Sequence, residues 1–235
     1  MGEDLMAVTY VGSATAGVNG IFWAQPLPSG IQTGDYMVML VQTRGTASTT
    51  VGTPTGWTRL VDQPRGTAGR MLIFCAPHGV AEPTFTSNAS GTHLSAVLAF
   101  RGVNLANPIF DHAYNQGSQA GTSNHPVPGL THAPEGSMIM RTAGATGATG
   151  ISWTWPGPDV ERVDYAGGFA ATITAATREW PTAGAVPSTT ANMSSSTISY
   201  GTTTIALNPA TSRLHLGSTP VPLMLGNTEV EVMGP

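Results

Sequence analysis

The stretch Met37-Val-Met-Leu-Val41 is a run of five apolar residues that follows the turn-forming pair Gly34-Asp35. Its length is that of a β-strand, and β-branched Val is frequent in it. Two further runs share this character, Met71-Leu-Ile-Phe74 and Ala96-Val-Leu-Ala-Phe100. Continuous apolar runs are typical of central strands that are covered on both faces or lie inside a sandwich. The sequence therefore predicts a sheet core built from these three strands.

Outward from these runs, the chain repeats strand-length apolar or Thr-rich segments that are bounded by Gly, Pro, Asn or Asp. Helical periodicity of twelve or more residues is nearly absent. This pattern predicts an all-β fold, an antiparallel β-sandwich of the jelly-roll type. The expected strands are residues 6–11, 36–43, 58–62, 70–76, 94–101, 138–142, 151–155, 161–165, 169–176 and 197–207.

The segment Thr202-Thr-Thr-Ile-Ala-Leu207 alternates between two faces. Thr203, Ile205 and Leu207 share one face, and Thr202, Thr204 and Ala206 share the other. Thr is β-branched and suits a pleated strand, and its hydroxyl keeps a face polar without charge. We therefore expect this strand to belong to an outer sheet with one face toward solvent.

A boundary is expected near residues 208–213, between a β-sandwich at 1–208 and a C-terminal arm at 209–235. The arm holds the pattern L-x-L-G-x-T-x-V twice, nine residues apart. Each unit predicts a short strand, a Gly-centred turn and a second short strand. Two such hairpins cannot form a core alone, so we expect the arm to pack on the main domain, on a copy of itself or on a partner. Its expected assembly residues are Leu214, Leu216, Gly217, Val221, Leu223, Leu225, Gly226 and Val230.

Charge is scarce in this chain of 235 residues: 9% is charged, and all nine basic residues are Arg. Without Lys, the chain has no P-loop lysine and no Schiff-base lysine. Dispersed Arg and a net charge of -4 do not make the basic patch of a nucleic-acid binder, so no nucleic-acid partner is expected. The single cysteine, Cys75, excludes an internal disulfide framework, and its apolar surroundings predict a buried, inert thiol.

Apolar runs are all far shorter than a membrane span, so no membrane insertion is expected. The N-terminal stretch carries acidic residues where a signal peptide has basic ones, and an individually secreted protein is not expected. We also expect no cofactor.

Several histidines and carboxylates could serve catalysis or metal binding, but each also has a structural interpretation. His112, His125 and His132 with Asp111 could supply metal ligands, but no pair has helical i, i+4 spacing, and surface or turn histidines are favoured. The chain has no G-x-S-x-G elbow. Carboxylates for glycoside hydrolysis could come from Asp159, Glu161 or Asp164. Glu161 and Asp164 fall on opposite faces of a regular strand, and charges that protect a sheet edge are the favoured interpretation.

Tryptophans are the remaining candidates for a binding surface. Trp153 and Trp155 are two residues apart and share a face on a strand, Trp180 precedes Pro181, and Trp23 precedes a Pro-rich loop. Exposed Trp can stack on sugar rings or anchor a protein interface. Packing in the core or between subunits is the favoured reading, with a glycan site as the alternative.

Several motifs occur in an order that resembles a β-sandwich module of bacteriophage tail and surface proteins. The resemblance covers roughly residues 5–205 and rests on Gly34-Asp35-Tyr-Met-Val-Met-Leu-Val41, Pro54-Thr-Gly56-Trp57-Thr-Arg-Leu60, the strand ending near Cys75, Glu82-Pro83-Thr-Phe85-Thr, Ala96-Val-Leu-Ala-Phe100-Arg101-Gly102-Val103 and Asn107-Pro108-Ile109. The Gly-x-Thr-x-Val repeat within residues 213–232 is similar to C-terminal tails of minor tail proteins in actinobacteriophages.

The resemblance implies a structural virion protein and not an enzyme, made in the host cytoplasm. We expect a minor tail protein at the tail tip, with other virion proteins and further copies of itself as partners and a host-surface glycan as a candidate receptor. A capsid decoration protein is the alternative, and a cell-envelope polysaccharide depolymerase is a third reading. No catalytic residue is carried over, because the shared motifs are structural.

Overall fold

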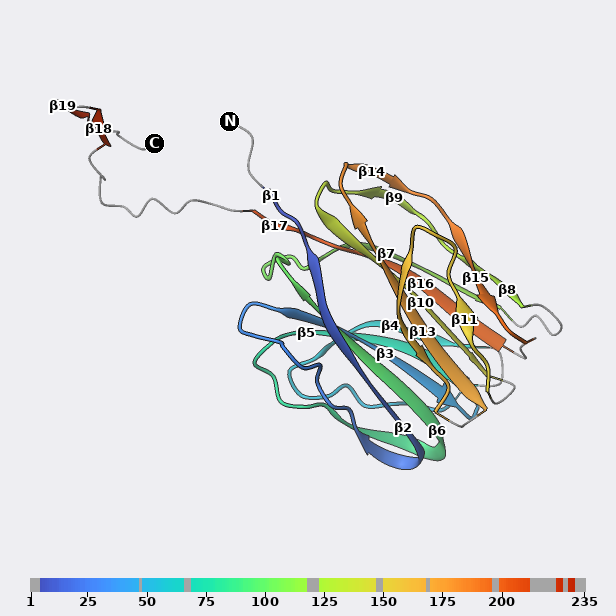
Figure 1. Ribbon diagram of the computed structural model, residues 1–235. Helices are drawn as coiled ribbons and strands as arrows, with labels where there is room; N and C mark the ends of the chain where they lie inside the picture. The colour runs from blue at the N-terminus through green and yellow to red at the C-terminus, as the bar shows by residue number, and fades with distance from the viewer. Residues whose placement is uncertain are drawn as a thin grey trace.

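The computed structural model describes residues 5–46, 48–65, 69–117, 123–146, 150–167, 170–195, 199–211, 223–225 and 228–230. All regular structure in these residues is β, and every strand pair in a sheet is antiparallel. The predicted fold class, an all-β antiparallel sandwich, is therefore confirmed (Figure 1).

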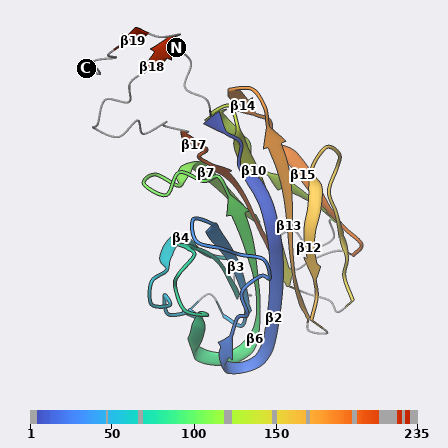
Figure 2. The ribbon, with the colours of Figure 1, turned by 60° about the vertical axis from the view of Figure 1, so that its left-hand side comes forward.

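Two five-stranded sheets form the sandwich, and Figure 2 shows them face to face. The first sheet has the order β2 (Thr9–Ala24), β6 (Thr84–Arg101), β3 (Tyr36–Arg44), β5 (Gly69–Pro77) and β4 (Thr58–Pro64). The second has the order β12 (Val160–Tyr165), β13 (Ala171–Trp180), β10 (Ser137–Thr146), β16 (Ser199–Leu207) and β7 (Ile109–Gly117).

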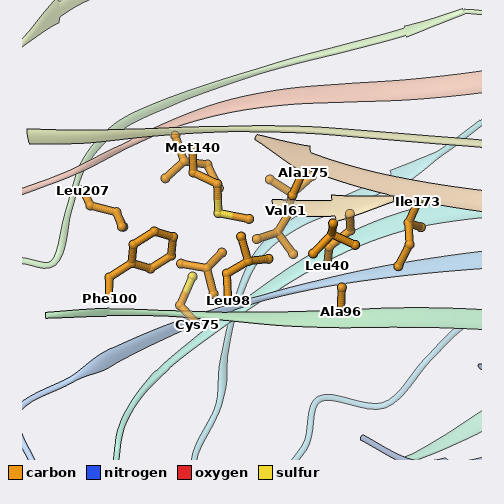
Figure 3. Packing of buried hydrophobic residues seen from close by; sticks show 14 of the residues in the cluster. Leu40, Val61, Cys75, Ala96, Leu98, Phe100, Met140, Ile173, Ala175 and Leu207 are labelled. Carbon is orange, nitrogen blue, oxygen red and sulfur yellow. The ribbon is translucent and has the colours of Figure 1, made fainter. Parts of the chain in front are cut away.

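The space between the two sheets is a continuous apolar core (Figure 3). Leu98 and Phe100 of the first sheet face Met140 and Leu207 of the second, and Leu40 lies beside Ile173 and Ala175; all of these side chains are buried. Most of these side chains come from the apolar runs and from one face of the Thr-rich strand. The three predicted central strands, β3, β5 and β6, are confirmed, and Cys75 is a buried free thiol as predicted.

A third layer covers the outer face of the second sheet. It consists of β11 (Trp153–Thr154), β15 (Thr189–Met193) and β8 (Asn124–Val127) in one small sheet, and β14 (Gly184–Val186) and β9 (Leu130–Ala133) in another. The expectation of a solvent-facing strand at the segment from Thr202 is therefore wrong, because β16 is buried along its whole length. Its two faces are divided as predicted, but the hydroxyls of Thr202 and Thr204 donate to the carbonyls of Pro126 and Pro128 in the covering layer.

The first sheet has its own apolar outer face, on which Met39, Leu72 and Phe74 are buried under loops. Trp57, from one of these loops, packs in the same cluster. Each sheet thus has buried residues on both faces, which explains continuous apolar runs at its centre.

The edge and covering strands depart most from the sequence prediction. β2 extends to Ala24 and β6 begins at Thr84, far beyond the predicted residues 6–11 and 94–101. The added length was missed because Gly, Ser, Thr and Asn interrupt its apolar pattern. β7, β8, β9, β14 and β15 were not predicted, and β11 is shorter than residues 151–155. Short strands without an apolar pattern lack the periodicity on which a prediction depends.

Strands at the two ends of the described chain complete the topology. β1 (Leu5–Met6) pairs with β17 (Ala210–Thr211). In the arm, β18 (Leu223–Leu225) pairs with β19 (Thr228–Val230), so strands are present where the second repeat unit predicts them. The first unit, with Leu214, Leu216, Gly217 and Val221, and the turn residue Gly226 lie outside the described residues.

Candidate functional site

The histidines predicted as candidate metal ligands are separated by the fold. His112 is exposed on β7 and His132 is exposed on β9, whereas His125 is fully buried on β8. The expectation of surface or turn histidines is therefore wrong for His125, which lies against the rings of Tyr200 and Trp153 at centroid distances of 4.4 and 5.5 Å. Within the described ranges, no three His, Cys, Asp or Glu side chains are grouped as a metal site.

The carboxylates considered for hydrolysis are held in different surroundings. Asp159 forms a buried ion pair with Arg141 of β10. Glu161 and Asp164 lie on β12, where a register shift next to Glu161 makes the strand irregular, so the alternation rule for a regular strand does not apply. Burial raises the pKa of Glu161, and the charge of Asp164 adds to this. Burial also raises the pKa of Asp164, against a hydrogen bond from the Trp153 amide.

Two of the four candidate tryptophans are core residues. Trp23 is buried between the rings of Phe85 and His93, at centroid distances of 4.7 and 4.6 Å. Trp153 is buried in the cluster between the second sheet and the third layer, and its indole N–H donates to the Thr172 hydroxyl at 3.0 Å. Neither indole presents a face on which a sugar ring could stack.

The other two tryptophans are half-buried. Trp155 packs against the same cluster as Trp153, and its indole N–H donates to the Thr174 hydroxyl at 2.9 Å. Trp180 lies at the end of β13, where the guanidinium of Arg178 stands 4.8 Å from the ring centroid. The structure thus separates the four candidates, and only these two keep partly accessible rings.

The motifs that carry the phage resemblance hold turns and strand ends together. Asp35, from the Gly-Asp pair, accepts hydrogen bonds from Nε and a terminal nitrogen of Arg101 at 2.8 and 2.9 Å. Burial alone would raise the pKa of Asp35, but the hydrogen bonds from Arg101 and the Gln32 amide outweigh it and lower that pKa. Residues 66 positions apart are thereby joined. The ion pair joins the turn before β3 to the last residue of β6.

The Pro54-Thr-Gly56-Trp57 motif is a tight turn in which the Trp57 amide donates to the Pro54 carbonyl at 3.1 Å. Gly56 has φ of 81°, and a Cβ there would lie 2.8 Å from Val80 Cγ1. We expect Gly56→Ala to lower the free energy of unfolding by about 2 kcal/mol, from backbone strain and overpacking. Urea unfolding measures this change.

Gly34→Ala is the matched control for this turn, because Gly34 also has a positive φ but no atom lies within 4 Å of the position that a Cβ would take there. Its expected cost is about 1 kcal/mol, from strain alone. Equal losses in the two variants would show that the contact with Val80 is not a constraint.

A polar cluster that the sequence did not reveal occupies one end of the space between the main sheets. Arg65 is completely buried, and it donates to the carbonyls of Gly144, Ser199 and Thr43 at 3.1, 3.4 and 3.2 Å. Burial lowers the pKa of Arg65 to about 9. Because these carbonyls belong to both sheets, Arg65 ties the sheets together. Nothing in its local sequence distinguishes it from a surface Arg in a turn.

Exposed apolar side chains mark the surfaces that remain for interaction. Ile21 and Phe22, on β2, are 52% and 59% exposed. Phe110, on β7, is also exposed, and its ring lies 5.7 Å from that of His132. Among the residues that the structure describes, the other exposed large apolar side chains are Met6, Leu105 and Val160.

Comparisons with protein-family models, with curated proteins and with solved structures gave no match to this chain. The described part of the chain contains no helix that is long and apolar enough to cross a membrane.

Proposed function

We propose that this protein is a structural component of a bacteriophage particle, a minor tail protein at the tail tip, which assembles with other virion proteins and with copies of itself. The observation that carries the proposal is that the C-terminal arm contains a separate β-hairpin. Its hairpin β18–β19 forms a two-stranded sheet with no pairing to any other described strand. Such a hairpin offers unpaired backbone groups on both outer edges, which suits docking by strand addition.

The ordered motifs and the low charge support the same role. Asp35, Gly56 and Arg101 are used for turns and an internal ion pair, as expected of motifs shared for structural reasons. A surface with few charges can be buried between subunits without the cost of stranded charges. Many copies acting together would give avidity from weak individual contacts.

The arrangement of the chain ends also suits an anchored subunit. β1 pairs with β17, so the chain enters and leaves the sandwich at the same place (Figure 1). Ile21 lies twelve positions after Thr9, the first residue of β2, or about 40 Å along that strand. A contact with the host surface, a glycan among the candidates, is assigned to surfaces away from the anchored end. Ile21, Phe22 and the half-buried ring of Trp155 are its candidate residues. The ring of Trp180 does not qualify, because Gly136 joins Trp180 to Val8 at the anchored end.

The location of the protein in particles tests this proposal. An antibody against the purified protein, with gold label, is expected to mark the tail tip in electron micrographs of phage that encode it. Label on the head instead would favour the capsid decoration protein, with the arm gripping the shell. Absence of the protein from washed particles would refute a virion role altogether.

The depolymerase reading has a separate test. Purified protein is incubated with host cell-wall polysaccharide, and soluble sugars are measured beside the variants Glu161→Gln and Asp164→Asn. We expect no release above a buffer control. Release that both variants abolish would overturn the non-enzymatic proposal.

A further inference from the structure

β7 is the outermost strand of the second sheet. β16 pairs with one edge of β7, and within the described ranges no strand pairs with the other edge. Its nine residues span about 30 Å, so a long row of backbone N–H and C=O groups is open to pairing. An edge of this kind is a template for an added strand unless its side chains discourage pairing.

The other long edges carry such protection. β4 carries Arg59 and Asp62, which pair with each other, Asp62 also pairs with Arg70 of the neighbouring β5, and the register shifts within β4. On the opposite side of the sandwich, β2 lies against β12, where the Ser13 hydroxyl donates to the Arg162 carbonyl at 3.3 Å. Both of these strands also contain register shifts. Charges and irregular pairing are the usual means of blocking an edge.

β7 lacks this protection over most of its length. Asp111 and His112 are its only titratable residues apart from Tyr114, and its single register shift lies at its start, opposite Leu207. From Ala113 to Gly117 the strand has no charged residue and pairs regularly with β16. The contrast with β4, β2 and β12 indicates that the edge of β7 is kept open for a partner.

The arm leaves the sandwich beside the start of this edge. Leu207, the last residue of β16, pairs with Ile109, the first residue of β7, and β17 follows it. Residues 212–222 then separate β17 from β18, and eleven residues reach at most about 40 Å. β17 continues β16 past the start of β7 and pairs with β1, so the described chain leaves the sandwich beyond the end of the β7 edge (Figure 1).

We propose that the open edge of β7 accepts the hairpin β18–β19 of a second copy by antiparallel or parallel strand addition. The inference rests on the proposed assembly role and names its partner. Three-residue strands are marginal on their own, and joining a nine-residue edge supplies the pairing they lack. Since each copy carries one donor hairpin and one acceptor edge, copies either exchange hairpins in a dimer or close a ring.

Two full-length variants test the donor and the acceptor separately. His112→Lys/Gln116→Lys adds charge at two exposed side chains of β7, and Met224→Pro/Glu229→Pro removes backbone donors from both strands of the hairpin. Sedimentation velocity is expected to show self-association of the unmodified chain and at least a tenfold higher dissociation constant for each variant. Mixing the two variants should restore a 1:1 complex. The β7 variant keeps its hairpin as donor, and the Pro variant keeps its β7 edge as acceptor.

The control variant is Thr84→Lys/Thr86→Lys, which adds the same charge at two exposed side chains of β6, in the part of that strand that pairs with β2. It should associate like the unmodified chain, and circular dichroism should show all three variants folded. Monomeric unmodified protein, an associating β7 variant, or no pairing in the mixture would each overturn the inference. If the antibody still marks the tail tip in that case, the proposed function stands without it.

Discussion

Replacing Arg141 by Met is expected to lower the free energy of unfolding by about 3–5 kcal/mol. The side chains of Arg141 and Asp159 are 3% and 2% exposed, and their ion pair lies where the second sheet meets the covering layer. Arg141 also donates to the Pro187 carbonyl at 2.7 Å, so one guanidinium holds two covering segments. The substitution leaves the Asp159 carboxylate buried without its partner, which costs far more than the loss of an exposed pair.

Chemical denaturation of variants separates this explanation from simple loss of packing. Arg141→Met/Asp159→Leu removes both charges and should recover part of the stability lost by Arg141→Met. Arg59→Met is the matched control, because its pair with Asp62 is partly exposed and is expected to contribute less than about 1 kcal/mol. A loss below about 1 kcal/mol for Arg141→Met would show that Asp159 reaches water.

Acid is expected to destabilise the protein through His125. Burial between the third layer and β16 lowers the pKa of His125 to about 4, whereas an exposed His titrates near pH 6.5. Between these values the unfolded chain binds a proton that the native state does not bind. The free energy of unfolding therefore falls as the pH is lowered from about 6.5 to about 4, by roughly 3 kcal/mol in total.

Urea unfolding at a series of pH values measures this loss, and His125→Leu should remove most of it. His93 is also buried, and burial lowers its pKa, so a smaller loss in the same direction should remain in that variant. Above pH 7 the contribution of His125 is expected to be constant. An unchanged pH slope in His125→Leu would mean that protonation elsewhere causes the acid sensitivity.

The centre of the fold was predictable because each apolar run indicates both the length of a strand and its burial. The apolar runs of β3, β5 and β6 are covered on both faces, and nothing polar interrupts them. The alternation of β16 also gave the correct division of its two faces. It could not reveal the third layer, because Thr202 and Thr204 are as compatible with water as with the carbonyls that they contact.

The functional surfaces were less predictable, for a different reason. Exposure of Trp depends on which strands lie opposite, so sequence spacing could not separate buried Trp153 from half-buried Trp155. β7 was not predicted because its mixture of polar and apolar residues has no strong apolar pattern. Its open edge follows from the order of strands in the sheet, which the sequence does not show. The strands of the second repeat unit were predictable because Leu and Val flank a Gly at hairpin spacing.

The pairing of β1 with β17 also determines how the sandwich bears load. Leu5 pairs with Thr211 at the outer end of this ladder, and Met6 pairs with Ala210 behind it. Tension that pulls the two chain ends apart would open these pairs one after another, like a zipper, instead of shearing the whole ladder at once. The β1–β17 ladder would therefore open before the sandwich unfolds. In a subunit held through both chain ends, this ladder would extend under load while the sandwich stays folded.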